Sequence, residues 1–253
     1  MSAASATVAS RLDELAVQLD QATRRINDLT FGHLRPTRAS ISTMTVTAKL
    51  NVRRVCRDSM AIALSLVDGD GPLAAHAHKS HKRKRSSVFF NQITLRHGTK
   101  SVKVIFNGSM HVTGCTSPAE FQRVADAVCD FMSEVAGIET SDGTPAVRLC
   151  DFDVQMINLN FGAGMQLPLR DLRDRCVEQG YVASYDTDMY PGLNVKVPVD
   201  QRRVTVLMFK SGKVIVTGAK TALELETAYG LIAAVLDAHA ASAATPPPNP
   251  DAT

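Results

Sequence analysis

An internal repeat constrains the fold of this chain more than any other feature. Residues 206–226, VLMFKSGKVIVTGAKTALELE, resemble residues 104–122, VIFNGSMHVTGCTSPAEFQ. In each segment a strand-like run reaches a Phe, a turn follows, a second run ends at Thr-Gly, and a helix start comes next. Phe106 and Phe209 are 103 residues apart, whereas Thr113 and Thr217 are 104 apart. A hairpin that recurs in nearly one register predicts two copies of one folding unit.

The flanking patterns extend the repeat to most of the chain. Each half begins with a strand (41–52, then 152–163) and a short helix (58–67, then 169–179). Three strands follow, which we expect at 88–96, 101–106 and 110–113 and again at 192–199, 203–209 and 213–217. A longer helix then closes each half, so both halves have the order β-α-β-β-β-α.

Both closing helices begin with a capping box. Ser117 is followed three residues later by Glu120, and Thr221 by Glu224. In such a box the hydroxyl accepts a hydrogen bond from an unpaired backbone N–H, while the Glu reaches back to another. The two boxes are 104 residues apart, so strand, turn, strand and cap repeat in one register.

Two such halves predict an α+β fold, with one continuous antiparallel sheet and its helices on one face. A sheet covered on one side should alternate apolar and polar residues along each strand. The strands at 204–209 and 214–217 instead carry apolar residues at both odd and even positions, so both faces of these strands are apolar. We therefore expect an apolar open face that binds a ligand or partner.

The remaining segments set limits on the class of protein. The chain has 253 residues, 45% hydrophobic and 21% charged, without an apolar run of membrane length or a secretory leader. We expect an amphipathic helix at 8–29, a linker at 30–40 and a disordered Ala/Pro-rich tail from His239. The five cysteines form no C-x-x-C pair, so buried reduced thiols are expected and zinc is not. No constellation of catalytic residues is evident, and neither an enzyme nor a cofactor is predicted.

The second half resembles the TATA-binding protein family. The segments MYPGLNVKV and VTVLMFKSGKVIVTGAK are similar to the family's second-repeat signature, with S-G-K and T-G-A-K matched without gaps. KVIFNGSMHVTG resembles the first-repeat signature once one residue is taken as missing. The resemblance implies a saddle of two pseudo-symmetric repeats with helices on the convex face. Its concave sheet would bind the DNA minor groove, and paired Phe side chains would wedge between base steps and bend the duplex.

The resemblance assigns site residues position by position. The DNA-intercalating residues would be Phe89, Phe106, Tyr190 and Phe209. The groove floor would be formed by Thr43, Thr45, Asn158, Val104, Thr113, Leu207, Ile215 and Thr217. Met156 competes with Asn158 for one floor position, and Phe90 is adjacent to Phe89. His111 departs from the family's apolar floor: it either donates to a base acceptor or marks a half that no longer grips DNA.

Basic residues imply phosphate contacts that are uneven between the repeats. The candidates are Lys100, Lys196, Arg203, Lys213 and Lys220. The turn and terminal lysines of the family are Ser109 and Thr116 in the first repeat. A basic run, HKSHKRKR, occupies residues 78–85 just before Phe89. It is interpreted in three ways: as a replacement for the lost phosphate contacts, as a solvated loop, or as a nuclear localisation signal.

The resemblance also implies partners. These are AT-rich double-stranded promoter DNA, an RNA polymerase initiation complex, and a transcription-factor-IIB-like protein that would meet Asp186 and Asp188 in the stirrup. Nuclear localisation follows, or a viral factory or virion if a large DNA virus encodes the chain. No membrane partner is expected, and dimerisation through the N-terminal arm is left open. The alternative function is a scaffold that has lost strong DNA binding and acts through protein contacts.

The expected domain organisation follows from these segments. It comprises an N-terminal extension (1–40), a first repeat (41–138), a linker (139–151), a second repeat (152–238) and the tail (239–253).

Overall fold

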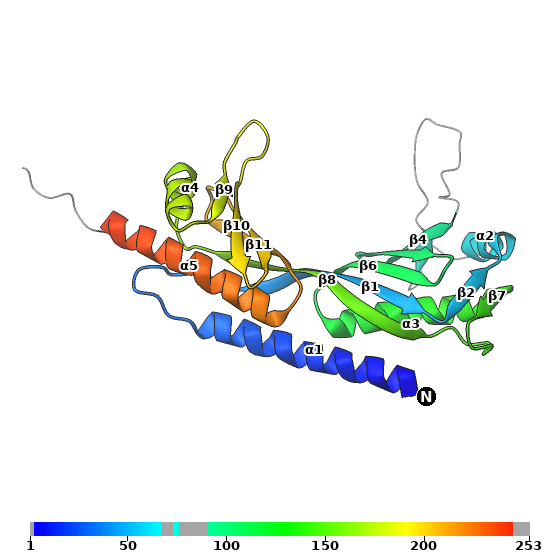
Figure 1. Cartoon of the computed structure of the whole chain (residues 1–253). Coiled ribbons are helices and arrows are strands. Elements are labelled where there is room, and N and C mark those ends of the chain that lie inside the picture. The colour runs from blue at the N-terminus through cyan, green and yellow to red at the C-terminus, as the bar shows by residue number, and fades with distance from the viewer. Residues whose placement is uncertain (1–2, 67–72, 76–90, 245–253) are drawn as a thin grey trace, which may run out of the picture. The chain divides into compact units, whose positions relative to one another are not determined.

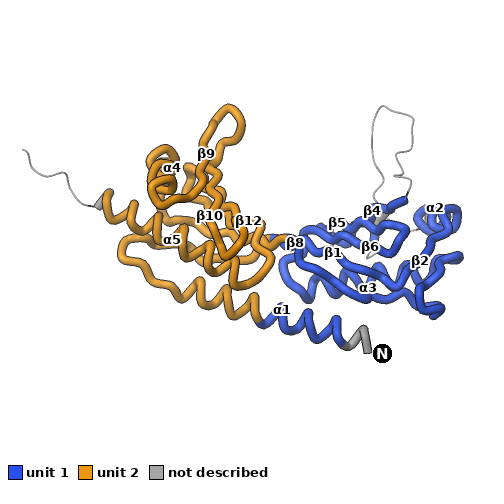
Figure 2. Tube along the Cα trace, in the orientation of Figure 1, with its two compact units in different colours: residues 1–17, 43–155 blue, residues 18–42, 156–253 orange. Residues whose placement is uncertain are grey.

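The computed structural model of the chain describes residues 3–66, 73–75 and 91–244. The chain, drawn as a cartoon in Figure 1, divides into two compact units, which Figure 2 colours separately: unit 1 contains residues 1–17 and 43–155, and unit 2 contains residues 18–42 and 156–253. Each unit thus combines one repeat of the sequence with part of the N-terminal region. None of the helices among the described residues is long and apolar enough to cross a membrane.

Unit 1 is an antiparallel sheet with a helix across one face. Its strands are ordered β3 (Ala74–Ala75), β4 (Gln92–His97), β5 (Lys100–Ile105), β6 (Ser109–Cys115), β1 (Ser40–Leu50) and the first part of β8 (Leu149–Gly162). The covering helix is α3 (Pro118–Glu134), which buries Phe121, Val128 and Met132 completely. The short helix α2 (Arg57–Leu66) and the two-stranded sheet of β2 (Val52–Val55) and β7 (Ile138–Thr140) complete the unit.

Unit 2 repeats this plan. The second part of β8 is followed by β12 (Lys213–Ala219), β11 (Arg202–Met208), β10 (Leu193–Val199) and β9 (Val182–Ser184). Helix α5 (Ala222–Ala244) packs on β10, β11 and β12, and α4 (Leu169–Glu178) packs on β9 and α5. Tyr229 of α5 is buried and its ring meets Phe161 edge to face, with centroids 4.7 Å apart.

Both predicted capping boxes are present. In unit 1 the Ser117 hydroxyl accepts from the Glu120 N–H at 3.2 Å, and Glu120 accepts from the Thr116 N–H at 2.8 Å. In unit 2 the Thr221 hydroxyl accepts from the Glu224 N–H at 3.1 Å, and Glu224 accepts from the Lys220 N–H at 2.7 Å. The reciprocal bonds start both helices at equivalent places.

The predicted amphipathic helix is α1 (Ala3–Asp28), and each unit holds its own part of it. In unit 1, Arg11 bonds Asp151 at 2.6 Å and lies over the Phe152 ring, 4.6 Å from its centroid. In unit 2, Arg25 makes a bidentate ion pair with Glu226, whose nearest contact is 2.7 Å. The apolar positions Leu12, Leu19 and Ile26 are buried, as their helical spacing requires.

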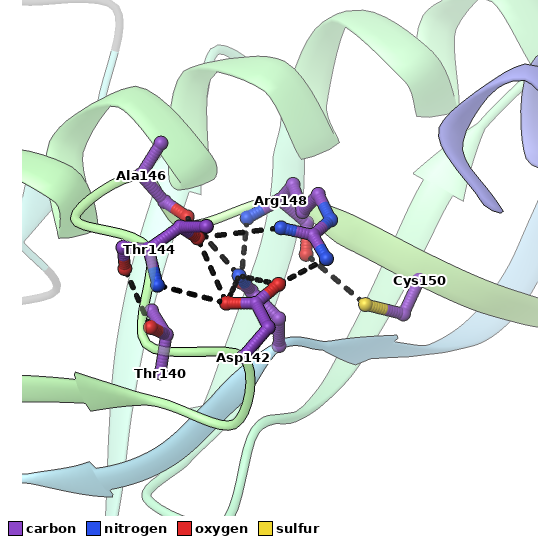
Figure 3. A network of polar contacts seen from close by, with 7 residues as sticks. Thr140, Asp142, Thr144, Ala146, Arg148 and Cys150 are labelled. Carbon is purple, nitrogen blue, oxygen red and sulfur yellow. Dashed lines mark hydrogen bonds and ion pairs between the residues drawn. The ribbon is translucent and has the colours of Figure 1, made fainter. Parts of the chain in front are cut away.

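The segment between the repeats is more ordered than a linker. Within unit 1, Asn51 directly after β1 is the only buried polar residue among those the structure describes. Its amide donates to the Asp142 carboxylate and the Ala146 carbonyl and accepts from the Arg148 N–H at 2.8 Å (Figure 3). Asp142 also accepts from Thr144 and pairs with Arg148, contacts that hold the pKa of its carboxyl well below the usual range. This network, the Asn51 clasp, joins β1 to the start of β8.

The prediction of a disordered tail from His239 was wrong for its first part. Helix α5 continues to Ala244, because HAASAA is rich in Ala, the strongest helix former. Residues 245–253, which contain the prolines, lie outside the described part of the chain.

Candidate nucleic-acid interface

The sheet of unit 2 has a face that none of the helices among the described residues covers. Along β11 and β12 the residues Val206, Val214 and Val216 are fully buried under α5. Thr205, Leu207, Ile215 and Thr217 alternate with them and stay partly exposed. The expected apolar open face is therefore present in this unit, with Asn158 and Asn160 of β8 on the same side.

Strand register orders this face into rows. In unit 2, Asn194 is opposite Leu207, Leu207 is opposite Ile215, and Ile215 is opposite Asn160. The centre of the row is thus apolar, and each end is an amide. We call these four residues the unit 2 floor row.

An aromatic pair stands at the end of the same face. Phe209 follows β11, and Tyr190 lies in the loop before β10; their ring centroids are 6.0 Å apart and the planes are inclined at 62°. A Cβ at Gly192 would lie 2.8 Å from Tyr190 Cε1 and 3.0 Å from Phe209 Cε1. Gly192 therefore allows both rings to pack over the backbone, with Tyr190 40% exposed.

The same register shows that two assignments in unit 1 were wrong. Lys103 is opposite His111 and Val104 is opposite Met110, as Leu207 is opposite Ile215 and Met208 opposite Val214. Lys103 therefore takes the place of Leu207, and Val104 is fully buried on the helix side. A shift of one residue moves a side chain to the other face of a strand, so Val104 does not belong to the floor.

Ile105, and not Phe106, occupies the position of Phe209. The Gly108 N–H donates to the Ile105 carbonyl at 3.0 Å, as the Gly212 N–H donates to Phe209 at 2.9 Å. The two turns thus have equal length, and no residue is missing from the first repeat. Phe106 corresponds to Lys210 within the turn, whereas Ile105 is 36% exposed on the open face.

The open face of unit 1 is also more polar. Thr94 is opposite Lys103, Lys103 opposite His111, and His111 opposite Thr47. These four residues, with Asp153 of β8, form the unit 1 floor row. Thr47 links to that strand, because its hydroxyl donates to the Asp153 carbonyl at 3.3 Å.

Most predicted phosphate contacts are placed suitably, and one is not. Arg203 and Lys213 are exposed, and Lys196, half-buried, donates to the Thr205 hydroxyl at 2.7 Å. Lys220 is half-buried directly before α5. Lys100 instead pairs with the capping carboxylate of Glu120 at 3.0 Å, with the two side chains only 19% and 22% exposed, so its assignment to phosphate was wrong.

Arg38 was not predicted as a phosphate contact, because residues 30–40 were interpreted as a linker. Thr37 pairs with Gly162: its N–H donates to the Gly162 carbonyl at 2.8 Å, and its hydroxyl accepts from the Gly162 N–H at 2.8 Å. This pairing places the exposed Arg38 beside Lys213, Ser211 and Asn160 around a hollow of about 480 Å³. No periodic pattern in the sequence signals such a contact.

The remaining candidates are placed as follows. Thr43, Thr45 and Thr113 are half-buried on the uncovered side of their strands. Asp186 and Asp188 are exposed in the loop between β9 and β10, where Asp186 accepts from the Asp188 N–H at 3.0 Å. Phe89 and the basic run at 78–85 lie outside the described residues.

Two of the five cysteines depart from the expectation of buried thiols, Cys56 and the half-buried Cys150. Cys115, Cys129 and Cys176 are buried, and burial raises the pKa values of their thiols to about 11, 12 and 11. Cys56 is exposed at the start of α2, where hydrogen bonds from Ser59 lower the pKa of its thiol. Among residues 3–66, 73–75 and 91–244, no group of three or more potential ligands is placed to hold a metal ion.

Known proteins share this arrangement. A family model described as transcription factor TFIID, or TATA-binding protein, matches residues 151–239. Over its second repeat the chain is similar to the TATA-binding protein family. The match covers β8 to α5, which contains the aromatic pair and the apolar floor row.

Curated relatives extend the similarity into the first repeat. The chain is 24% identical over 185 residues to a TATA-box-binding protein-like protein of Acanthamoeba polyphaga mimivirus, covering 62% of this chain and 50% of that protein. It is 27% identical over 165 residues to the TATA-box-binding proteins of Caenorhabditis elegans and Saccharomyces cerevisiae. Those matches cover 65% of this chain and 44% and 62% of the relatives. The chain thus spans about half the length of these relatives.

A solved structure shares the fold. The TATA-binding protein of Methanococcus jannaschii matches with a TM-score of 0.55 at 19% identity, covering 79% of this chain and 98% of that one. This likeness confirms the predicted fold class, an α+β fold of the TATA-binding protein type.

Proposed function

We propose that the chain is a transcription factor that binds AT-rich promoter DNA in the minor groove, bends it, and recruits an initiation complex. The observation that carries the proposal is the unit 2 face, where Leu207 and Ile215 form an apolar floor beside the Tyr190–Phe209 pair. Apolar wedges that enter a base step kink the duplex toward the major groove. The match of the second repeat to the TATA-binding protein family supports the same conclusion.

The charges around this face suit a phosphate backbone. Arg203 and Lys213 are exposed on the strands that carry the apolar floor, and Arg38 lies beside Lys213. Neutralising phosphates supplies the sequence-independent part of the affinity and makes binding salt-dependent. We extend the proposal to Thr43, Thr45, Thr113, Thr217 and Asn158 as floor contacts.

Recruitment of an initiation complex is assigned to the loop between β9 and β10 of unit 2, which is the stirrup. Asp186 and Asp188 are exposed there beside Met189, which is 83% exposed. We propose that a transcription-factor-IIB-like protein docks on this loop, and that the protein acts in the nucleus or in a viral factory.

A pair of phenylalanine variants tests the wedge. We expect Phe209→Ala to reduce the bend of a TATA-containing duplex, measured by fluorescence energy transfer between its ends, more than it reduces non-specific affinity. Phe106→Ala is the matched control, because Phe106 lies in a turn at the place of Lys210. Equal bends for wild type and Phe209→Ala would refute the wedge assignment.

One observation favours a second function. Unit 1 has Ile105 in place of the wedge and Lys103 and His111 in place of the apolar floor. A chain whose first repeat no longer grips DNA would act as a protein scaffold. Absence of duplex binding across a salt series would favour that function.

A further inference from the structure

The unit 1 floor row differs from the unit 2 floor row in chemistry. At the two central positions unit 1 has Lys103 and His111, where unit 2 has Leu207 and Ile215. These are the same places in the register, so each unit presents a different pair of groups to whatever lies on its open face. Among the described residues, neither the Lys103 nor the His111 side chain makes a hydrogen bond or ion pair, so their donors are available.

A hollow accompanies the polar row. It has a volume of about 410 Å³ on the open side of unit 1, and Gln92, Lys103, Ile105, His111 and Asp153 are among the residues that line it. The Asp153 carboxylate is exposed there, held by the Gln155 amide, which also donates to the Thr47 hydroxyl at 2.9 Å. The row therefore offers donors and one carboxylate acceptor within a recess.

The hydrogen-bonding groups of the DNA minor groove complement the donors and the carboxylate of this row. A·T and T·A pairs present only acceptors there, the adenine N3 and the thymine O2, whereas a G·C pair adds the guanine N2 amine, a donor. An apolar floor leaves that amine without a hydrogen-bond partner, which is costly once water is excluded. A carboxylate on the floor has the opposite preference, because the guanine amine is the one donor that base edges offer in the minor groove.

We propose that unit 1 reads a half-site containing a G·C pair, while unit 2 requires A·T pairs. Lys103 and His111 donate to the base acceptors, and Asp153 accepts from the guanine N2 amine in the recess. This inference rests on the proposed minor-groove function and adds a base preference that distinguishes the two repeats. The chain would then recognise a composite sequence with an orientation, and not a uniform AT-rich tract.

Single replacements in an AT-only duplex test the proposal. Affinity is measured by fluorescence anisotropy at constant salt while one A·T pair at a time becomes G·C. In the half contacted by unit 2 we expect each replacement to weaken binding by about 5- to 150-fold, the usual range for a mismatched pair. In the other half we expect at least one replacement that leaves binding unchanged or tighter.

Inosine isolates the amine, because an I·C pair lacks the N2 group and presents an A·T-like minor groove. Replacing G·C by I·C should restore binding in the sensitive half. At the tolerant position it should remove any gain that the amine provides through Asp153. If I·C and G·C bind alike at every position, the amine is not read and the proposal is overturned.

Protein variants test whether the unit 1 floor row is responsible for the tolerance of G·C. The triple variant Lys103→Leu, His111→Ile and Asp153→Ala gives unit 1 the apolar centre of the unit 2 row and removes the carboxylate, so it should make both halves sensitive to G·C. Asp153→Ala should weaken binding only to the duplex with G·C at the tolerant position. Lys196→Leu is the matched control, because it removes one open-face cation from unit 2 and should lower affinity for all duplexes by a similar factor.

These experiments distinguish failure of this inference from failure of the proposed function. If wild type binds the AT-only duplex and rejects G·C equally at every position, this inference is overturned and the proposed function stands. If tolerance persists in the triple variant, Lys103, His111 and Asp153 do not carry it, and the assignment is overturned. If no duplex is bound at any salt concentration, the proposed function fails and this inference fails with it.

Discussion

Replacing Glu120 by Gln should destabilise the protein in a pH-dependent manner. The carboxylate accepts from the Thr116 N–H at 2.8 Å and lies 3.0 Å from Lys100 Nζ. These contacts lower the pKa of Glu120 from 4.5 to about 2. At about 1.4 kcal/mol per unit, the charged form contributes up to about 3 kcal/mol to the free energy of unfolding. Because the folded pKa is depressed, this contribution is complete above about pH 5 and is lost as pH falls toward 2.

Urea unfolding of wild type and Glu120→Gln at pH 7, 5, 4 and 3 provides the assay. We expect a difference of about 1 to 3 kcal/mol at pH 7 that shrinks steadily below pH 5. Other carboxylates are common to both proteins, so the difference between them isolates Glu120. The matched variant Glu224→Gln alters the equivalent cap of α5 and should cost about 1 kcal/mol at pH 7. A gap of the same size at pH 7 and pH 3 would contradict the role assigned to the Glu120 charge.

Three further predictions concern the interface and the fold. Replacing Lys213 and Lys220 together by Ser should flatten the slope of log affinity against log salt by up to about two units, at roughly 0.9 per phosphate contact; an unchanged slope would remove these residues from the interface. Ile105→Phe combined with Gln92→Gly should give unit 1 an aromatic wedge and increase the bend angle measured by fluorescence energy transfer, whereas a smaller bend would argue against the equivalence of Ile105 and Phe209. Asn51→Ala should lower the free energy of unfolding by about 2 kcal/mol or more, because the buried Asn51 amide makes three hydrogen bonds that alanine cannot replace; a loss below about 0.5 kcal/mol in urea unfolding would show that the Asn51 clasp contributes little.

The sequence predicted best those features that depend on neighbouring residues. The strand-turn-strand pattern and both capping boxes were found because alternation and caps act within a few residues. The α+β fold followed from their order. Within unit 2, Phe209 and Leu207 were assigned to the open side, and the structure places them there.

The errors have one common origin, which is contact between distant segments. Aligning Phe106 with Phe209 introduced a gap that the cross-strand register excludes. The resulting shift of one residue assigned Val104 to the open face, although it lies on the helix side. The pairing of Lys100 with Glu120 spans 20 residues, and the pairing of Thr37 with Gly162 spans 125. Neither contact leaves a periodic trace in the sequence, so Lys100 was overvalued as a phosphate contact and Arg38 was missed.

The division of the chain into units has a consequence for its synthesis. Unit 1 needs residues up to 155, and unit 2 needs residues 18–42 together with everything after 155. A nascent chain can therefore complete unit 1 first, whereas the end of α1 and the segment that follows it wait for β12 and α5 to leave the ribosome. A cut between the sequence repeats would separate residues 18–42 from the rest of unit 2. Expression of unit 2 alone therefore requires a circularly permuted or split design that retains residues 18–42, and not a simple truncation.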